Sequence, residues 1–388
     1  GYSSIVGIDN DKVDKYIIYV LDSVITANTS HIANYDALDT LKDLEKKGRV
    51  RLSGDKDKIK VEPDSSISSK DEWRNTVGEY IAKLAGRMGV SAEKLNIVTS
   101  PSIGKYDEWT YYSYPDLVTM ELLDGLWKAI KDSVGENLTI ILDITHGVNF
   151  MPVITMFVSR LAASLALLKG SGVVTIKVYN AMPTTWDYRK VFSEQVRFVV
   201  PPEEPGNPIV KAYLMGMPIV VYKLCKLCGS SKQCSANVDM EINHEGKNVE
   251  YKSTIGFKKY YECLLEGLIC SRATNRLQEL MEGDLFNKIN EVSSRLISSE
   301  LNNMRTAIND AVRNAKQSFE DYVLYASISK DYEEYKKRSK ESDNRFRRHA
   351  IAHAGLLEDY TLIKKCDNDY CIDIDDSVLK KLGLSCRH

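Results

Sequence analysis

Two short stretches of the sequence combine residue types that can bind anions or transfer protons. The first, LDITHGVNFMP at positions 142–152, places polar residues between an apolar strand-like run and an apolar helical pattern. Free N–H groups at the start of a helix favour a phosphate, and imidazole or amide groups can bind a sugar or base edge. The stretch is therefore a candidate anion site with Thr145, His146, Gly147 and Asn149 as its contacts.

A purely structural interpretation of the first stretch is equally open. Thr145 can cap a helix that begins at Gly147. His146 can be a hydrogen-bonded polar residue beside the end of a strand. The local sequence alone does not choose between the two interpretations.

Polar residues also follow two other predicted strands. Asp22 and Ser23 end the apolar run KYIIYVL, and a Ser/Pro/Gly loop with Ser102 and Gly104 follows the run LNIV. Because ligands of open parallel sheets bind at the carboxyl ends of the strands, these residues favour a pocket at one edge of a sheet.

The second stretch is SDNRFRRHAIAHAGL at positions 342–356. Arg345, His349 and His353 are spaced four apart, so a helix would place them on one face, beside small alanines. Such a face leaves room for a large anion. The alternative is a solvated basic face with a buried histidine, which is the more usual meaning of such residues on a helix.

The elements that must position these residues fall into two parts. In the first part strands alternate with helices, which is typical of an open parallel sheet with helices on both faces. We predict the following ranges: strand 15–24, helix 31–47, a polar hairpin at 49–62, helix 72–88, strand and loop 95–106, helix 115–133, strand 138–143, helix 147–168, strand 173–180, and a last strand within 192–200.

A Pro/Gly/Glu linker near positions 201–208 marks the boundary between the two parts. We predict an α/β Rossmann-like domain over 1–205 and a mainly α-helical domain over 206–388, with a possible hairpin at 239–254. The length of 388 residues suits two or three domains.

Charge and apolar content exclude some classes of protein. The formal net charge of −2 argues against a chain that coats nucleic acid over its whole surface. The apolar run 150–168 is interrupted by Ser159 and Arg160, so we predict a buried helix and no membrane association. The expected location is the cytoplasm.

The eight cysteines are too few for a disulfide scaffold in a chain of this length, so most should be thiols in a reducing cytosol. Cys225, Cys228 and Cys234, with His244, resemble an incomplete zinc site. Buried thiols or a Cys225–Cys234 disulfide are preferred, with a second disulfide between Cys366 and Cys371. No metal site is predicted.

The motif DITHGVNFMP after a buried strand resembles a characteristic motif of the CARF domain, the Rossmann-like sensor of CRISPR-associated proteins. CARF domains pair as dimers and bind cyclic oligoadenylate across the two-fold axis. The resemblance therefore implies this activator, in the form of cyclic tetra-adenylate, over positions 145–149. The residues Asp22, Ser23, Ser102 and Gly104 would complete the pocket.

The run RHAIAHAG at positions 348–355 resembles the R-x4-H motif of HEPN ribonucleases. The resemblance assigns Arg348 and His353 to catalysis and leaves Arg345 and His349 as candidates for RNA binding. Arg348 and His353 are about 140° apart on a regular helix. A composite site from two protomers around a two-fold axis would relieve that mismatch.

Together the two motifs resemble the CARF–HEPN ribonucleases that accompany type III CRISPR systems in prokaryotes. The resemblance implies an allosteric homodimer or higher homo-oligomer, of archaeal origin, that cleaves single-stranded RNA without a metal cofactor in antiviral defence. Two alternatives remain open. One is a ligand-sensing regulator whose helical domain binds DNA or protein, and the other is a sensor that also degrades its activator.

Overall fold

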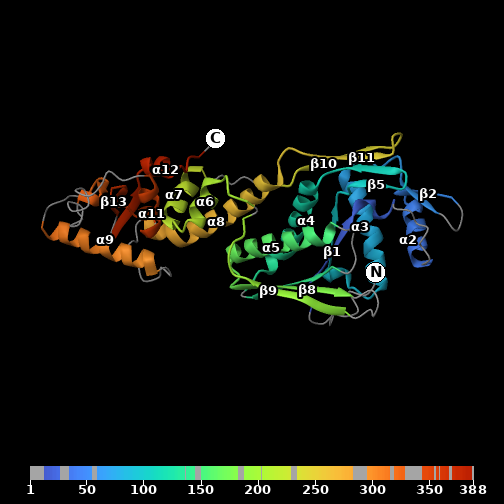
Figure 1. The fold of residues 1–388 in the computed structure, drawn as a ribbon, viewed down its shortest axis with the longest axis horizontal. Helices are drawn as coiled ribbons and strands as arrows, with labels where there is room; N and C mark the ends of the chain where they lie inside the picture. Colours follow the sequence, from blue (N-terminus) through green and yellow to red (C-terminus); the bar gives the residue numbers. More distant parts are fainter. Residues whose placement is uncertain are drawn as a thin grey trace. The chain divides into compact units, whose positions relative to one another are not determined.

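The structure, a computed structural model, is shown in Figure 1. It describes residues 13–26, 35–54, 59–135, 137–144, 150–181, 188–201, 203–228, 234–282, 295–314, 319–327, 343–353, 355–357, 359–366 and 369–386. Contacts divide the chain into a first unit, Gly1–Pro202 with Cys234–Tyr261, and a second unit, Glu203–Gln233 with Glu262–His388. The boundary between the units at positions 202 and 203 lies close to the expected one, whereas the segment 234–261 belongs to the first unit and not to the second.

The first unit alternates strands and helices over most of its length, as the sequence predicts. Its helices begin where local chemistry favours them: Ser69 caps α3 by accepting a hydrogen bond from the Glu72 N–H, and Pro115 stands in the first turn of α4. The elements are β1 (Tyr16–Leu21), η2 (Asp22–Val24), α2 (Tyr35–Lys46), β2 (Val50–Ser53), β3 (Lys60–Pro63), α3 (Lys70–Arg87), η3 (Ala92–Lys94), β4 (Leu95–Ser100), β5 (Gly104–Tyr106), β6 (Trp109–Tyr112), α4 (Pro115–Ile130), η4 (Lys131–Ser133), β7 (Asn137–Asp143), α5 (Met151–Lys169), β8 (Val173–Ala181) and β9 (Tyr188–Val196).

The strand pairing is only partly that of one open parallel sheet. β1 pairs with β4 in parallel, from Tyr16 opposite Leu95 to Leu21 opposite Ser100. β7 pairs with β8 in parallel, but β9 runs antiparallel to β8. Within the described ranges these are two separate hydrogen-bonded sheets, so the expectation of a single parallel sheet is wrong in this respect.

Helix α5 packs along one face of the β7–β8–β9 sheet (Figure 1). Among the residues that the structure describes, it is the one helix long and apolar enough to cross a membrane by length and composition, and 61% of that apolar window is buried within the protein. Its buried side chains include Val158, Leu161 and Leu165. The prediction of a buried helix is confirmed.

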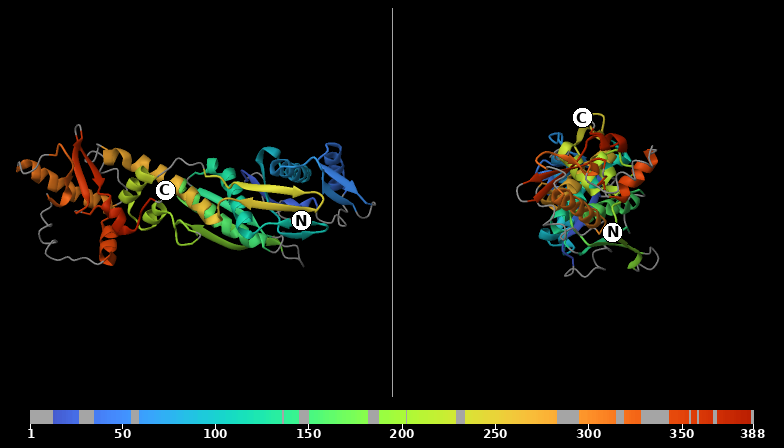
Figure 2. Two further views of the ribbon diagram at one scale, coloured as in Figure 1. Left: turned by 90° about the horizontal axis from the view of Figure 1, so that it is seen from above. Right: turned by 90° about the vertical axis from the view of Figure 1, so that its left-hand side faces the viewer.

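The predicted hairpin at 239–254 forms as β10 (Val238–Asn243) and β11 (Asn248–Ser253). β11 pairs in parallel with β6, so the sheet order is β10–β11–β6–β5, and Figure 2 shows the yellow hairpin beside the blue and cyan elements. Lys247 in the hairpin turn forms ion pairs with Glu62 and Glu108. A segment far along the sequence thus completes a sheet of the first unit.

The second unit combines helices with a small sheet. Its elements are α6 (Pro208–Leu214), α7 (Pro218–Cys228), most of α8 (Phe257–Glu282), α9 (Arg295–Arg313), β12 (Val323–Leu324), η6 (Tyr325–Ser327), α11 (Asp343–Ala352), β13 (Thr361–Cys366), β14 (Asp369–Ile374) and α12 (Ser377–Leu382). β12, β13 and β14 form an antiparallel sheet that the sequence analysis did not predict. The unit therefore contains both helices and a sheet, and a mainly α-helical HEPN domain stays a prediction.

All eight cysteines lie in the described ranges, and none of them is a free thiol, which contradicts the expectation of reduced cysteines. Cys225 pairs with Cys270 and Cys228 with Cys386, so the preferred Cys225–Cys234 disulfide is wrong. Cys225 in α7 and Cys270 in α8 are 45 positions apart in the sequence but have Cα atoms only 5.5 Å apart, so the fold and not closeness along the chain selects the partner. The predicted Cys366–Cys371 disulfide is confirmed.

Candidate ligand-binding and catalytic sites

The carboxyl ends of β1 and β4 hold three of the predicted site residues together. Asp22 Oδ1 accepts a hydrogen bond from the Ser102 backbone N–H at 2.9 Å. In return, the Ser23 backbone N–H donates to Ser102 Oγ at 2.9 Å. These two bonds tie the loop after β4 to the turn after β1. All three side chains are buried, with exposed fractions of 0 to 2%.

Asp22 lies in an environment that disfavours its charge. Burial raises the pKa of Asp22 from 3.8 to about 7, although hydrogen bonds from Ser102 and the charge of Arg74 oppose the rise. Its second carboxylate oxygen is buried and makes no hydrogen bond. This carboxyl therefore titrates near neutral pH and does not face solvent.

Two tyrosines of the β5–β6 hairpin extend this cluster. Tyr111 shares a hydrogen bond of 2.7 Å with the hydroxyl of Thr26, which in turn donates to the Ser23 carbonyl. Tyr106 packs edge-on against Tyr111 with ring centroids 5.7 Å apart. Buried hydroxyl groups thus connect the turn after β1 to the sheet that β10 and β11 complete.

Gly104, the fourth predicted residue of these strand ends, lies apart from the buried cluster at the start of β5. It is exposed and has a φ of +104°, and a Cβ built there would meet no atom within 4 Å. The backbone conformation, and not a lack of space, is therefore what favours glycine at this position. Its backbone is accessible, in contrast to Asp22, Ser23 and Ser102.

The predicted ligand contacts Thr145, His146, Gly147 and Asn149 lie outside the described residues. The helix that follows was predicted from position 147, whereas it begins at Met151 with Phe150 at its N-cap position. Pro152 stands in the first turn, where a missing N–H costs no hydrogen bond. The ligand-binding role of the four residues stays a prediction.

Helix α11 positions the predicted catalytic pair. Arg348 lies within the helix and is exposed. The helix ends at Ala352, and His353 follows it directly. Because His353 sits at the helix end, the angular mismatch calculated for a regular helix does not strictly apply to it. Arg345 and His349 belong to the same helix, but their side chains lie outside the described part of the structure.

A glycine fixes where α11 ends. Gly355 has a φ of +90°, and its N–H donates to the Ala350 carbonyl at 2.8 Å. A Cβ at this position would lie 2.8 Å from Cγ2 of Val220 in α7. Only glycine satisfies both the backbone conformation and this close approach, so it terminates the helix next to His353.

An acidic residue that the sequence analysis missed contacts the catalytic candidate. Nδ1 of His353 lies 3.1 Å from Oε1 of Glu300 in α9. The His353 side chain is 37% exposed and that of Glu300 is 18% exposed. No local signal in the sequence connects these two residues, because they come from different helices.

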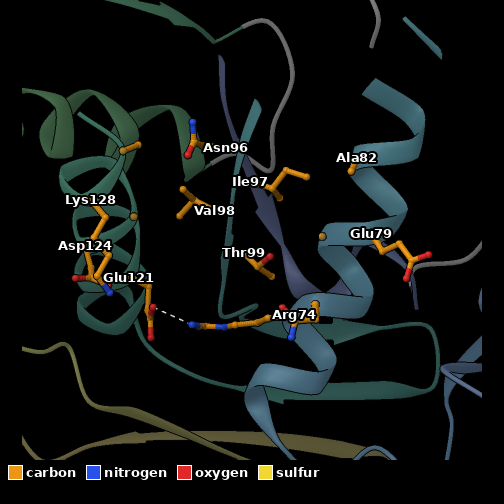
Figure 3. Close-up of a pocket in the computed structure, with 14 residues that line it drawn as sticks. Arg74, Glu79, Ala82, Asn96, Ile97, Val98, Thr99, Glu121, Asp124 and Lys128 are labelled. Atoms are coloured by element: carbon orange, nitrogen blue, oxygen red, sulfur yellow. Dashed lines mark hydrogen bonds and ion pairs between the residues drawn. The ribbon is translucent and has the colours of Figure 1, made fainter. Parts of the chain in front are cut away.

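A cavity of about 550 Å³ lies between α3 and α4 at the edge of β4 (Figure 3). It exists because both helices present small residues spaced four apart, Gly78 and Ala82 from α3 and Gly125 and Ala129 from α4. A Cβ on Gly125 would lie 2.3 Å from Cγ1 of Val98, so α4 approaches β4 closely only with glycine there.

Arg74 and Glu121, which line this cavity, belong to a cluster of charged side chains in which Glu121 is buried and Arg74 and Lys70 are partly buried. Arg74 donates to Glu121 at 2.9 Å, as the dashed line in Figure 3 marks, and the Lys70 ammonium lies 3.6 Å from the same carboxylate. Of the predicted ligand-binding residues that the structure describes, namely Asp22, Ser23, Ser102 and Gly104, none lines this cavity. It is therefore separate from the strand-end cluster.

The candidate zinc ligands are not arranged to hold a metal. Cys225 and Cys228 are in disulfides, and the Nε2 of His244 is 3.0 Å from the Ile67 carbonyl. Within the described ranges, no group of three or more His, Cys, Asp or Glu side chains has the arrangement of a metal site.

Comparison with known proteins concerns the first unit. No curated protein matches the chain. Residues 2–183 match the model of the family described as "CRISPR system endoribonuclease Csx1, CARF domain". The matched region contains Asp22, Ser23, Ser102, Gly104 and positions 145–149. CARF domains in general bind cyclic oligoadenylates, and this match supports a CRISPR-associated CARF protein with a ligand-sensing amino-terminal domain of mixed sheets and helices.

Proposed function

We propose that this chain is an endoribonuclease that cyclic oligoadenylate activates in type III CRISPR antiviral defence. The observation that carries the proposal is the R-x4-H pair, Arg348 and His353, at the end of α11 in a unit separate from the CARF match. The expected substrate is single-stranded RNA and the expected location is the cytoplasm.

The two residues suit metal-independent cleavage of RNA. The imidazole of His353 can accept the proton of a 2′-hydroxyl, because its ordinary pKa lies near neutrality. The 2′-oxygen then bonds to phosphorus, the bond from phosphorus to the 5′-oxygen breaks, and an imidazolium returns a proton to that oxygen. The products are a 2′,3′-cyclic phosphate and a 5′-hydroxyl. Arg348 is exposed and permanently charged, so it can hold the phosphate as its charge grows.

A dimer supplies what one chain lacks. The reaction needs one group to take a proton and another to give one, and a two-fold axis near α11 would bring two copies of His353 to one phosphate. Arg345 and His349 would then line the path of the RNA. The active site is thus a composite of two protomers.

The activator site lies at the strand ends of the first unit. Cyclic tetra-adenylate would contact Thr145, His146, Gly147 and Asn149, together with the exposed backbone at Gly104. The buried residues Asp22, Ser23 and Ser102 would shape this site by holding the neighbouring loops. Ligand binding would shift the paired protomers between two arrangements, of which one is competent for cleavage.

The test is cleavage of a fluorescent single-stranded RNA in EDTA, with and without cyclic tetra-adenylate. Wild type, His353→Ala and the control Arg313→Ala are compared, with activator binding measured separately by calorimetry. Arg313 is exposed at the end of α9 in the same unit, so its loss removes a positive charge from a helix other than α11. We expect activator-dependent cleavage by wild type and Arg313→Ala, and none by His353→Ala.

Other results would select the alternatives. Activator binding without cleavage by wild type would make the chain a regulator that binds DNA or protein. Loss of cyclic tetra-adenylate over time in the His353→Ala sample would show that the sensor also degrades its activator. Cleavage that EDTA abolishes would contradict a metal-independent mechanism.

A further inference from the structure

We infer that Glu300 is a positioning residue for His353: its carboxylate accepts a hydrogen bond from the Nδ1–H group and leaves Nε2 as the nitrogen that exchanges protons with RNA. The inference rests on the proposed function and deepens it by naming which atom of His353 acts. It starts from the separation of 3.1 Å between Nδ1 of His353 and Oε1 of Glu300.

Glu300 is held at the border of a buried helix face. Leu301, Met304 and Ile308 of α9 are fully buried and recur at the helical period. Glu300 precedes Leu301, so packing of α9 fixes the direction from which its carboxylate reaches His353. The Glu300 side chain is only 18% exposed, so few water molecules compete with the imidazole for its carboxylate.

His353 is fixed from the other side by the end of α11. Its carbonyl accepts a hydrogen bond from the Leu356 N–H at 2.9 Å, and Gly355 closes the turn onto Ala350. A residue at a helix end also meets the negative end of the helix dipole, which favours the imidazolium form. Both members of the pair are therefore anchored by different elements, and the contact does not depend on a flexible loop.

The contact has a chemical consequence. A neutral imidazole has one nitrogen that donates and one that accepts, and the hydrogen bond at one nitrogen decides which is which. A carboxylate can only accept, so it selects the form with the proton on Nδ1. The lone pair on Nε2 is then available for the 2′-hydroxyl proton. The same carboxylate stabilises the positive ring after the proton arrives.

The main test uses Glu300→Gln, which keeps the size of the side chain and removes its charge. Cleavage of single-stranded RNA by the full-length protein is measured with saturating cyclic tetra-adenylate. We expect kcat to fall on the order of 10- to 100-fold, with the KM for RNA unchanged because Glu300 does not touch substrate. Glu300→Asp should recover part of the rate. Asp310→Asn, which changes the other acidic residue of α9, should cleave as wild type does.

A spectroscopic measurement tests the same inference without catalysis. Nitrogen NMR of ¹⁵N-histidine-labelled protein identifies the protonated ring nitrogen, and the His353→Ala spectrum assigns the signal among the six histidines. The neutral ring should carry its proton on Nδ1 in wild type and lose this preference in Glu300→Ala.

The results distinguish failure of the Glu300 inference from failure of the proposed ribonuclease function. Wild-type kcat in Glu300→Gln, while His353→Ala is inactive, would overturn the inference and leave the proposed function intact. If wild type cleaves no RNA, the proposed function fails, and the NMR result decides the arrangement by itself. A proton on Nε2 of the neutral His353 ring would overturn it.

Discussion

Two acidic side chains in different units of this protein each contact a nitrogen of a residue that follows the end of a strand or helix. Asp22 in the first unit is fully buried and is bonded to the backbone N–H of Ser102. Glu300 in the second unit is 18% exposed and faces an imidazole that is 37% exposed. The first pair is closed to solvent, whereas the second is partly open to solvent.

This difference indicates that solvent accessibility, and not residue type, decides whether a hydrogen-bonded carboxyl group can take part in proton transfer. A closed carboxyl cannot contact a substrate and acts through the loops that it holds. An open carboxylate and imidazole pair can bind a reacting group and transfer a proton. We therefore expect changes at the two places to move different properties: stability and its pH dependence in the first, and cleavage in the second.

The largest expected effect concerns Arg348→Ala. In the proposed mechanism Arg348 holds the phosphate, so loss of its charge should lower activator-dependent RNA cleavage by roughly 10²- to 10³-fold. Thermal stability should change little because Arg348 is exposed. Cleavage assays and melting curves of Arg348→Ala and Arg313→Ala measure this. An equal loss of cleavage in Arg313→Ala would mean that general positive charge matters and not a specific phosphate contact.

Asp22→Asn should stabilise the protein above neutral pH. The pKa of Asp22 is 3.8 in an unfolded chain and about 7 in the folded one. Between these pH values the folded chain keeps a proton that the unfolded chain has lost, so stability falls as pH rises from about 4 to about 7. At pH 8 wild type bears the full free-energy cost of burying the charged Asp22 carboxylate. Asn stays neutral and keeps the acceptor for the Ser102 N–H, so the free energy of unfolding should rise by about 2 to 4 kcal/mol.

Urea unfolding of wild type and Asp22→Asn at pH 4.5 and pH 8 measures this difference. The gain from Asn should be small at pH 4.5, where wild-type Asp22 is still mainly protonated in the folded state. An equal gain at both pH values would show that burial of charge is not the cause.

Gly355→Ala should destabilise the second unit by about 1 to 3 kcal/mol. Alanine disfavours a φ of +90°, and its Cβ would press on Val220. Cleavage should fall as well, because His353 lies two residues away at the helix end. Thermal melting and RNA cleavage are compared with those of Gly267→Ala in α8, where a Cβ meets no atom and no loss is expected. Unchanged melting in Gly355→Ala would contradict the role of this turn.

Ser102→Ala is expected to have the smallest effect, about 1 to 2 kcal/mol of lost stability. The substitution leaves the buried Ser23 N–H without its acceptor. Ser100→Ala is the matched control, because the buried Ser100 hydroxyl makes no hydrogen bond. Denaturant unfolding of both variants tests whether the strand-end cluster is held by this specific bond, and equal losses would contradict it.

The strand ends were predictable because their pattern is local. Short β-branched runs that stop at Asp22 or Ser100 indicate buried parallel strands, and parallel strands place such ends at one edge. The register of β1 and β4 then brings Leu21 opposite Ser100. What the pattern did not reveal is that Asp22 and Ser102 face each other in a closed cluster. Burial depends on the β5–β6 hairpin that covers them.

Other features depended on contacts between distant segments. The β10–β11 hairpin was predicted, but its pairing with β6 was not, because strand partners are chosen by packing. The Cys225–Cys270 disulfide has the same origin, since α7 and α8 meet only in the folded chain. The start of α5 was predicted at position 147 instead of Met151, because threonine is a favourable N-cap residue type and Thr145 stands just before position 147.

The sequence by itself determined the alternation of strands and helices in the first unit, the polar residues at the strand ends and the Arg348–His353 spacing, because each depends on neighbouring residues and on backbone periodicity. Only the tertiary structure decided that Asp22 is sealed from solvent and that Glu300 meets His353. Solvent exposure and contacts across helices depend on how separate elements pack, and no local pattern carries that information.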